Sequence, residues 1–153
     1  MTKLCSDVLK ALDGKTLCTA ESLTGGGIGA ALTSVPGASQ VFKGGVISYT
    51  DEVKREVLGV PAADLTAYGA VSAPVAEAMA RGVRELLKAD VAVSVTGLAG
   101  PDGDEFGHDV GTVFIGYADQ NGVIAGEYHF AGDRESVRAQ TIESALRLIL
   151  EKL

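Results

Sequence analysis

The chain has 153 residues, of which 46% are hydrophobic and 22% are charged, and its formal net charge is −7. This length and composition predict one globular domain over residues 1–153, and the acidic balance argues against nucleic-acid partners, which clustered Lys and Arg would recognise. There is no ~20-residue apolar run and there are only two cysteines, so we expect no membrane span, no disulfide framework and a cytoplasmic location.

The spacing of apolar residues and turn signals predicts helices and strands that alternate through the first two thirds of the chain. Helices are expected at residues 3–12, 28–35, from 50 onward, 72–88 and from 133 to the end, with a turn or helix at 61–65. Strands are expected at residues 16–19, 45–49, 90–95, 111–118 and 123–130. Asn121-Gly122 joins the last two and is a strong hairpin signal. This order implies an α/β fold whose mixed sheet carries helices on both faces.

Three polar side chains stand at the ends of strands that are expected to run parallel. Ser22 follows the first strand, Tyr49 ends the second, and Thr96 follows the third. The carboxyl ends of parallel strands meet at one edge of the sheet, where ligands bind in open α/β folds. We therefore expect these three residues to share one site.

Ser22 lies between the first strand and a helix, directly before Leu23, Thr24 and the glycine triplet 25–27. The first N–H groups of a helix are unpaired and its dipole is positive there, so an anion or oxyanion is stabilised beside them. The surrounding sequence is not Gly-x-Ser-x-Gly and has no lysine three residues later, which excludes two hydrolase patterns. Ser22 is either a structural helix cap or a nucleophile.

Lys54 falls on the inner face of the helix expected after residue 50, within the arc marked by Val53, Val57 and Leu58. Such a lysine either extends along the surface to reach solvent or is partly desolvated, and desolvation lowers its pKa toward use as a neutral base. Tyr49, five residues earlier, either shares a proton network with Lys54 or is an ordinary residue of an amphipathic strand.

Arg134 and Arg138 project into the inner face of the last expected helix, near its start. A cation is unfavourable beside the positive end of a helix dipole. Their placement therefore indicates an anionic partner. That partner is either a ligand carboxylate or phosphate, or a salt bridge to Asp133 or Glu135.

The segment Thr96-Gly97-Leu98-Ala99-Gly100 could bring backbone N–H groups close to a ligand. No metal site is predicted, because neither His108 nor His129 has a second ligand at helical or turn spacing. Residues 102–107 imitate the start of a calcium loop, but Phe106 replaces an oxygen ligand, so we expect a solvated loop. Spacing alone leaves His108 as a rival base for Ser22.

With these residues identified, the sequence resembles the C-terminal domain of the competence-damage-inducible CinA family along nearly its whole length. The chain departs from the usual pattern at His108-Asp109, where a lysine and a proline are expected, and at Asp104, where glycine is common. The resemblance rests on several blocks in the right order. They are Thr19 to Gly26, Gly44 to Tyr49, Lys54, Gly59-Val60, Gly69 to Ser72, Thr96 to Gly103, Val110 to Val113 and Phe130 to Arg134.

The resemblance implies a three-layer α/β/α sandwich with a mixed, mostly parallel five-stranded sheet. It also implies hydrolysis of nicotinamide mononucleotide to nicotinate mononucleotide and ammonia, with Ser22 as nucleophile, Lys54 as base and Tyr49 assisting, and with no metal or cofactor. The residues expected to bind the substrate are Thr24, Gly25, Gly26, Thr96, Gly97, Ala99, Gly100, Arg134 and Arg138.

Two other functions stay open at this point. One is a module of the same type that binds a pyridine nucleotide or docks a partner without turnover. The other is a Ser22–His108 hydrolase of a different amide or ester. We expect a homo-oligomer, because the low aromatic content and alanine-rich helices suit close subunit packing, and we expect neither a nucleic-acid nor a membrane partner.

Overall fold

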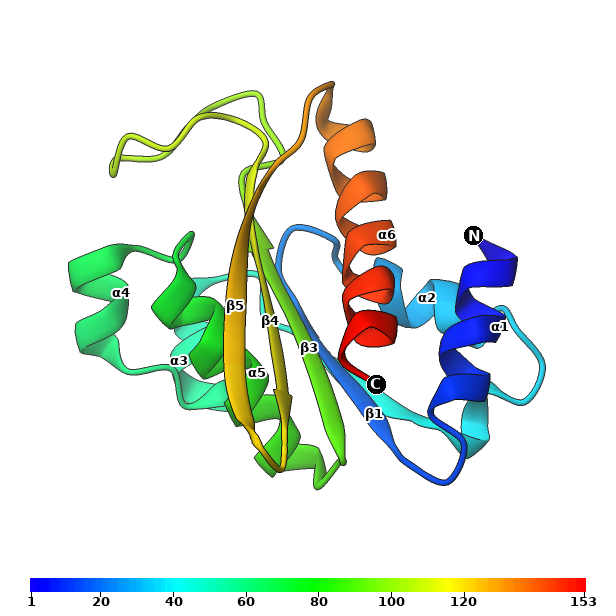
Figure 1. The fold of residues 1–153 in the computed structure, drawn as a ribbon. Helices are drawn as coiled ribbons and strands as arrows, with labels where there is room; N and C mark the ends of the chain where they lie inside the picture. The colour runs from blue at the N-terminus through cyan, green and yellow to red at the C-terminus, as the bar shows by residue number, and fades with distance from the viewer.

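In the computed structural model, which describes residues 1–153, one five-stranded sheet lies between two layers of helices (Figure 1). The predicted three-layer α/β/α architecture is thereby confirmed. The strands are β1 (Leu17–Glu21), β2 (Phe42–Ile47), β3 (Val91–Gly97), β4 (Thr112–Asp119) and β5 (Gly122–His129). The helices are α1 (Thr2–Ala11), α2 (Gly27–Thr33), the 3₁₀ helix η1 (Ala38–Gln40), α3 (Asp51–Leu58), α4 (Ala62–Tyr68), α5 (Ala73–Leu87) and α6 (Arg134–Lys152).

The sheet has the strand order β2-β1-β3-β4-β5. β1 pairs in parallel with β2 and β3, whereas β4 pairs antiparallel with β3 and β5. Strand β4 thus runs against the other four. The turn between β4 and β5 is closed by the Asn121 N–H, which donates to Asp119 Oδ1 at 2.8 Å. This turn lies at the end of the sheet opposite the carboxyl ends of β1 and β3 (Figure 1).

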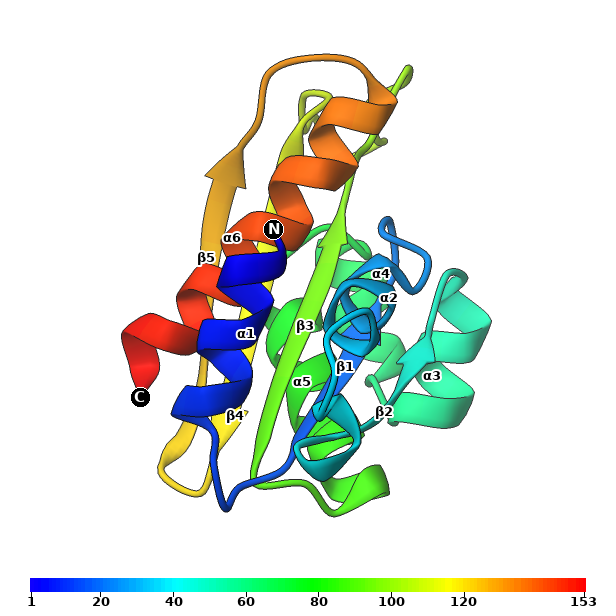
Figure 2. The same cartoon turned by 90° about the vertical axis from the view of Figure 1, so that its right-hand side faces the viewer.

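Helices α1, α2 and α6 cover one face of the sheet, and α3, α4 and α5 cover the other (Figures 1 and 2). Strand side chains alternate between the two faces, so each strand contributes to two cores. In β3, Val91, Val93 and Val95 pack into the larger core with α1 and α6, whereas Ala92 packs into the smaller one with α5. Small residues on the second face let α5 approach the sheet closely.

Four strand boundaries differ from the predicted ones by two residues or more. β2 begins at Phe42 instead of residue 45, and β3 ends at Gly97 instead of residue 95, so that Thr96 lies within the strand. The other two are the ends of β1 and β2. β1 continues through Ala20 and Glu21, which pair with Val46 and Ile47 of β2. A charged residue is compatible with this central strand because the Glu21 carboxylate is fully hydrogen-bonded, as described below. β2 ends at Ile47, so Tyr49 lies two residues beyond the strand rather than at its end. The 3₁₀ helix η1 was not predicted.

Helix α3 has a defined start and stop. The Thr50 side chain accepts a hydrogen bond from the Val53 N–H, and Gly59, at φ 72°, closes the helix in the left-handed region that favours glycine. The end of α3 meets α5 at Gly82, where a Cβ atom would fall inside van der Waals contact of the Leu58 carbonyl oxygen. The absence of a side chain at position 82 therefore sets how closely α3 packs on α5.

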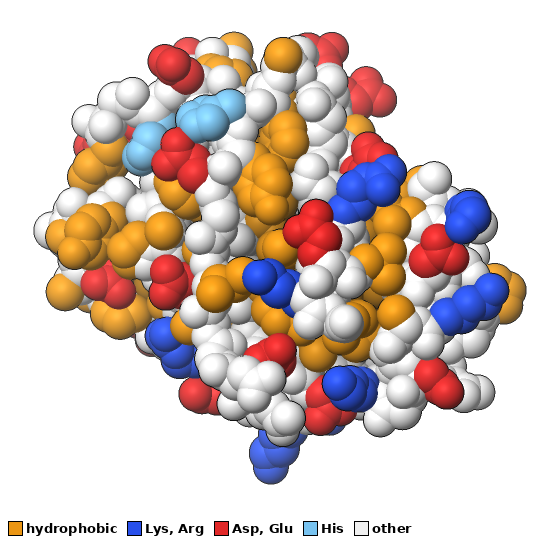
Figure 3. All heavy atoms as spheres, viewed as in Figure 1, with side chains coloured by type: hydrophobic (Ala, Val, Ile, Leu, Met, Phe, Trp, Pro, Cys, Tyr) orange, Lys and Arg blue, Asp and Glu red, His pale blue; other side chains and the backbone are white.

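On the face shown in Figure 3, Lys and Arg side chains lie interspersed with Asp and Glu and form no continuous basic patch. None of the helices combines the length with the apolar character that a bilayer crossing requires. The absence of nucleic-acid partners and the formation of a homo-oligomer stay predictions.

Replacing Gly82 with Ala should destabilise the fold, although alanine is intrinsically the better helix former by about 1 kcal/mol. Overpacking against a backbone carbonyl costs about 1–3 kcal/mol and outweighs that gain, because the backbone of α3 must move. We expect a melting temperature lower by several degrees, since about 1 kcal/mol corresponds to about 2–4 °C at this chain length. Arg81→Ala, an exposed neighbour in the same helix, is the control, and equal melting temperatures for the two variants would contradict the close contact.

Candidate active site

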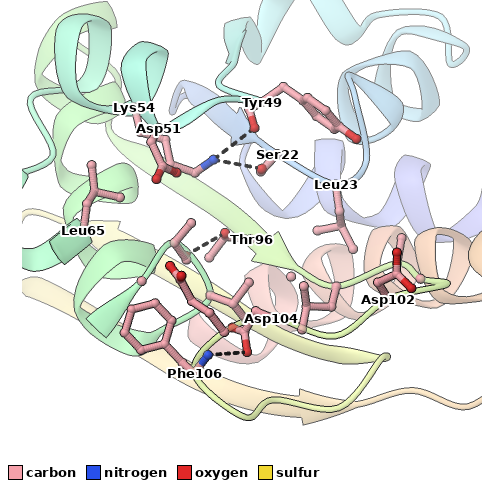
Figure 4. Close-up of a pocket in the computed structure, with 18 of the residues that line it drawn as sticks. Ser22, Leu23, Tyr49, Asp51, Lys54, Leu65, Thr96, Asp102, Asp104 and Phe106 are labelled. Carbon is pink, nitrogen blue, oxygen red and sulfur yellow. Dashed lines mark hydrogen bonds between the residues drawn. The ribbon is translucent and has the colours of Figure 1, made fainter. Parts of the chain in front are cut away.

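The carboxyl ends of β1, β2 and β3 open onto a cavity of about 630 Å³. Ser22 directly follows β1, Tyr49 follows β2 by two residues, and Thr96 is the penultimate residue of β3. All three line this cavity together with Lys54 from α3 (Figure 4). Arg134, from the start of α6, also lines it. Five of the predicted substrate-binding residues also line it: Thr96, Gly97, Ala99, Gly100 and Arg134. Four do not: Thr24, Gly25, Gly26 and Arg138.

The centre of the cavity is a hydrogen-bonded pair of Ser22 and Lys54. Lys54 Nζ lies 3.0 Å from Ser22 Oγ and donates to the Tyr49 carbonyl oxygen at 3.5 Å (Figure 4). It also donates to the Ser48 carbonyl oxygen at 2.8 Å. No carboxylate lies within ion-pair distance of this amine. The amine is therefore held by neutral oxygens only.

Lys54 is only 1% exposed, so it does not extend to solvent. It shares the buried face of α3 with Leu58, whereas Val57, which was expected on that face, is 44% exposed. Burial disfavours the charged ammonium and lowers the pKa of Lys54 from 10.5 to about 8, although the charge of Asp51 opposes this shift. A substantial neutral fraction near pH 8 makes Lys54 competent as a base.

Glu21 is a second buried ionisable group of this region, and it was not singled out from the sequence. Its side chain is 2% exposed. One carboxylate oxygen accepts from the Thr24 hydroxyl at 2.6 Å and from the Ile28 N–H at 2.8 Å, and the other accepts from the Gly29 N–H at 3.1 Å. Glu21 therefore occupies the positive end of α2 and ties the turn that follows Ser22 to that helix.

This arrangement corrects the expectation that the start of α2 is open to an external anion. Its second and third N–H groups donate to Glu21, and the Gly25 and Gly27 N–H groups donate to the carbonyl oxygens of Ser22 and Thr24. In the turn, the Leu23 and Thr24 N–H groups donate no hydrogen bond within the chain, and neither does the Ala99 N–H across the cavity. The donors available to an oxyanion lie before α2 rather than in it.

The two arginines of α6 have different surroundings. Arg134 donates to the Gly100 carbonyl at 2.6 Å and to the Tyr49 hydroxyl at 3.1 Å, and it remains exposed at the rim of the cavity. Arg138 donates to the carbonyls of Leu23 at 2.9 Å and Thr24 at 3.2 Å. Neither forms a salt bridge. Arg138 thus fastens the turn after Ser22 to α6, and Arg134 is the guanidinium that faces the cavity.

Tyr49 contacts Lys54 through its backbone and not through its ring. Its carbonyl accepts the Lys54 hydrogen bond, while its hydroxyl accepts from Arg134 and the residue is 58% exposed. The proposed proton network between the Tyr49 hydroxyl and Lys54 is not formed in this structure. The hydroxyl of Thr96 donates to the Ala70 carbonyl at 2.8 Å, which joins the end of β3 to the segment that precedes α5.

His108, the rival base, does not line the cavity and makes no hydrogen bond to Ser22. Its Nδ1 lies 2.7 Å from Asp104 Oδ2. No group of three or more His, Cys, Asp or Glu side chains is placed to hold a metal ion. The geometry therefore pairs Ser22 with Lys54.

Comparison with known proteins shows which family and which relatives the chain is similar to in sequence. The family described as the CinA C-terminal domain matches residues 1–153. A CinA-like protein of Geobacter metallireducens is 47% identical over 140 residues, which are 92% of this chain and 34% of that protein. A CinA-like protein of Synechococcus is 60% identical over 114 residues, 73% of this chain and 27% of that protein. The matched part of the chain spans 34% and 27% of the length of these two curated relatives.

Solved structures are similar over the whole fold. The crystal structure of competence damage-inducible protein A from Klebsiella pneumoniae superposes with a TM-score of 0.96 at 38% identity, covering 99% of this chain and 95% of that one. A competence-damaged protein (CinA) superfamily member from Escherichia coli gives a TM-score of 0.97 at 36% identity, covering 99% and 90%.

Replacing Glu21 with Gln should lower the free energy of unfolding by about 1–3 kcal/mol, because a buried N–H of α2 loses its acceptor. Urea denaturation at neutral pH measures this loss. Glu135→Gln, at an exposed position in the first turn of α6, is the control and should change stability by no more than about 0.5 kcal/mol. Equal effects for both variants would rule out the buried cap.

The low pKa of Lys54 makes stability depend on pH in a defined direction. Between pH 8 and pH 10.5 the unfolded chain keeps a proton that folded Lys54 has lost, so the free energy of unfolding should rise with pH. Below pH 8 both states are protonated and the full cost of the buried charge is present. Across the window the rise is on the order of 3 kcal/mol.

Lys54→Met should lack this rise because it carries no buried charge at any pH. The free energy of unfolding of wild type should therefore rise relative to that of the variant from pH 8 upward, as urea denaturation at pH 7, 8.5 and 10 would measure. Lys43→Met, at an exposed position of β2, is the matched control. If the free energy of unfolding depends on pH in the same way for Lys54→Met and for wild type between pH 8 and pH 10.5, the pKa of Lys54 is not lowered in the folded protein.

Proposed function

The chain belongs to the CinA C-terminal domain family, and we propose that it is a nicotinamide-nucleotide amidohydrolase, which converts nicotinamide mononucleotide to nicotinate mononucleotide and ammonia. The observation that carries this proposal is the buried Lys54 amine 3.0 Å from Ser22 Oγ. A serine hydroxyl becomes a nucleophile when a neighbouring base removes its proton, and a lysine can be that base once desolvation has lowered its pKa. The identity of the substrate is inferred from the resemblance to the family, and the reaction type is inferred from the paired Ser22 and Lys54 side chains.

In the proposed first step, neutral Lys54 takes the proton of the Ser22 hydroxyl while Ser22 Oγ bonds to the carboxamide carbon. The Ser48 carbonyl holds one N–H of the amine, which leaves the nitrogen lone pair free to face Ser22. The C–O double bond opens to an oxyanion. The unpaired N–H groups of Leu23 and Ala99, two residues that line the cavity, are the donors available for it, and each such donor can be worth about 3 kcal/mol in the transition state.

Collapse of this intermediate breaks the C–N bond. The Lys54 ammonium returns its proton to the departing nitrogen, so ammonia leaves and a Ser22 ester remains. Lys54, again neutral, then removes a proton from a water molecule that attacks the ester carbon. When the second intermediate collapses, the bond between Ser22 Oγ and the carbon breaks and Oγ takes the proton back from the Lys54 ammonium. Nicotinate mononucleotide leaves as the acid and ionises to its carboxylate by losing a proton to solvent, and one water molecule has been consumed for each ammonia formed.

Arg134 is proposed to hold the substrate phosphate. Its guanidinium is exposed at the rim of the cavity and is oriented by the Gly100 carbonyl and the Tyr49 hydroxyl. Planar guanidinium groups suit phosphate oxygens. Tyr49 therefore assists by orienting Arg134 and by its backbone contact to Lys54, whereas Arg138 is occupied by the turn after Ser22.

The proposal predicts ammonia release from nicotinamide mononucleotide in the presence of a chelator, with kcat rising as the pH passes upward through about 8, because only neutral Lys54 accepts a proton. Ser22→Ala and Lys54→Ala should each lower kcat by at least about 100-fold. Lys43→Ala should match wild type.

Two outcomes would contradict the proposed amidohydrolase and favour one of the other two functions. Nucleotide binding by the wild type with no ammonia release would favour the sensing module over the amidase. Loss of turnover in His108→Ala, with turnover kept in Lys54→Ala, would favour the serine–histidine hydrolase.

A further inference from the structure

The loop between β3 and β4, residues 98–111, carries features that the Ser22–Lys54 chemistry does not use. Phe106 from this loop lines the cavity on the side opposite Ser22 and Lys54 (Figure 4). Phe106 is 41% exposed, so part of this large apolar residue is open to the cavity or to solvent. Tyr49, the other aromatic residue of the cavity wall, has its hydroxyl bound to Arg134.

The Phe106 ring rests against Gly69, between α4 and α5. A Cβ atom at position 69 would lie 2.5 Å from the ring, closer than such atoms approach, and the φ of Gly69 is +77°. A glycine is therefore needed for the ring to occupy this position. The ring atoms next to Gly69 are Cε2, Cδ2 and Cζ, so this edge of the ring lies against the backbone while the residue also borders the cavity.

The loop holds Phe106 through Asp104 and His108. Asp104 Oδ1 accepts from the backbone N–H groups of Phe106 at 3.1 Å and His108 at 2.9 Å, and Oδ2 lies 2.7 Å from His108 Nδ1. The His108 ring contacts Phe114 of β4 edge to face, with centroids 6.0 Å apart. We refer to Asp104 and His108 as the loop clamp. Although burial alone would raise the pKa of Asp104, the hydrogen bonds from His108 hold it below its ordinary value.

Each residue of the loop clamp contributes a contact that a different side chain would not make. A glycine at position 104 would remove both side-chain acceptors, and a lysine at position 108 would remove the ring that packs on Phe114. Asp104 and His108 thus act together to fix the backbone on either side of Phe106.

We propose that Phe106 is a specificity-determining residue, on whose ring the planar aromatic ring of the substrate amide stacks, and that the loop clamp is what positions it. This inference rests on the proposed function for the identity of that ring. An aromatic face is complementary to a flat ring, and the more so to a positively charged one such as an N-substituted pyridinium. The site would then hold its substrate at two ends, with the phosphate at Arg134 and the ring at Phe106.

The test is the kinetics of ammonia release from nicotinamide mononucleotide by Phe106 variants. Phe106→Ala should raise KM roughly tenfold, which is the order of a base stacked on an aromatic side chain, and should change kcat by less than about threefold because Ser22 and Lys54 are untouched. Phe106→Tyr keeps the ring face and should restore the wild-type KM, whereas Phe106→Leu should fall between. Leu86→Ala, an exposed apolar residue of α5 outside the cavity, is the control and should leave KM unchanged.

Positioning by the loop clamp has its own readout. Asp104→Ala should raise KM in the wild-type background and have no further effect in the Phe106→Ala background, since it acts through the ring. Ribose 5-phosphate, which lacks the aromatic ring, should inhibit wild type and Phe106→Ala with the same inhibition constant. If Asp104→Ala raises KM by the same factor in the wild-type and Phe106→Ala backgrounds, the loop clamp does not act through the Phe106 ring and its positioning role is overturned.

Calorimetric binding of nicotinamide mononucleotide to the same variants separates this inference from the proposed function. Binding that weakens in Phe106→Ala supports the ring contact even if the wild type releases no ammonia, in which case only the amidase assignment fails. Equal affinity of wild type and Phe106→Ala overturns the ring contact whether or not there is turnover. A wild type that neither binds nor hydrolyses the nucleotide overturns both.

Discussion

The burial of a single amine without a carboxylate partner is the constraint on which this site depends. Transfer of an ammonium out of water is costly, and the Ser48 carbonyl at 2.8 Å offsets only part of that cost. The cost that is not offset lowers the pKa of Lys54 to about 8. The folded state is therefore less stable at neutral pH than it would be without this buried amine, but the amine can act as a base near pH 8. The caps of α3 and its close packing on α5 hold Lys54 in this unfavourable environment.

A buried carboxylate lies one residue before the serine, yet it does not neutralise this amine. Adjacent residues at the end of a strand project to opposite faces of the sheet, and Glu21 accordingly contacts α2 while Ser22 contacts Lys54 of α3. A direct ion pair would favour the charged ammonium and raise the pKa of Lys54. The central strand β1 thus separates the two ionisable groups, so that one stabilises the turn and the other remains available as a base.

Most helices and strands could be predicted from the sequence, because apolar periodicity and turn residues depend on only a few neighbouring positions. They placed Lys54 on a buried face for the same reason, although they assigned Val57 to that face as well. They could not identify Glu21, whose carboxylate binds N–H groups seven and eight residues further on, nor the bonds from Arg138 to carbonyls more than 110 residues earlier. Such contacts depend on how the layers pack. The spacing of Asp104 and His108 was visible, but a loop gives no periodicity by which to judge whether two side chains meet.

Because β4 runs against the other strands, the turn that follows it lies at the end of the sheet away from the cavity and can be altered without touching the site. β4 leaves the cavity edge at Thr112 and carries the chain to the far end of the sheet, where the exposed turn at Gln120 and Asn121 returns it along β5. That turn is fixed by its own local hydrogen bond and lies a full strand length from Ser22. It is consequently a suitable position at which to insert a peptide tag or attach a fluorophore, so that the protein could be immobilised or followed in a cell with its cavity unobstructed.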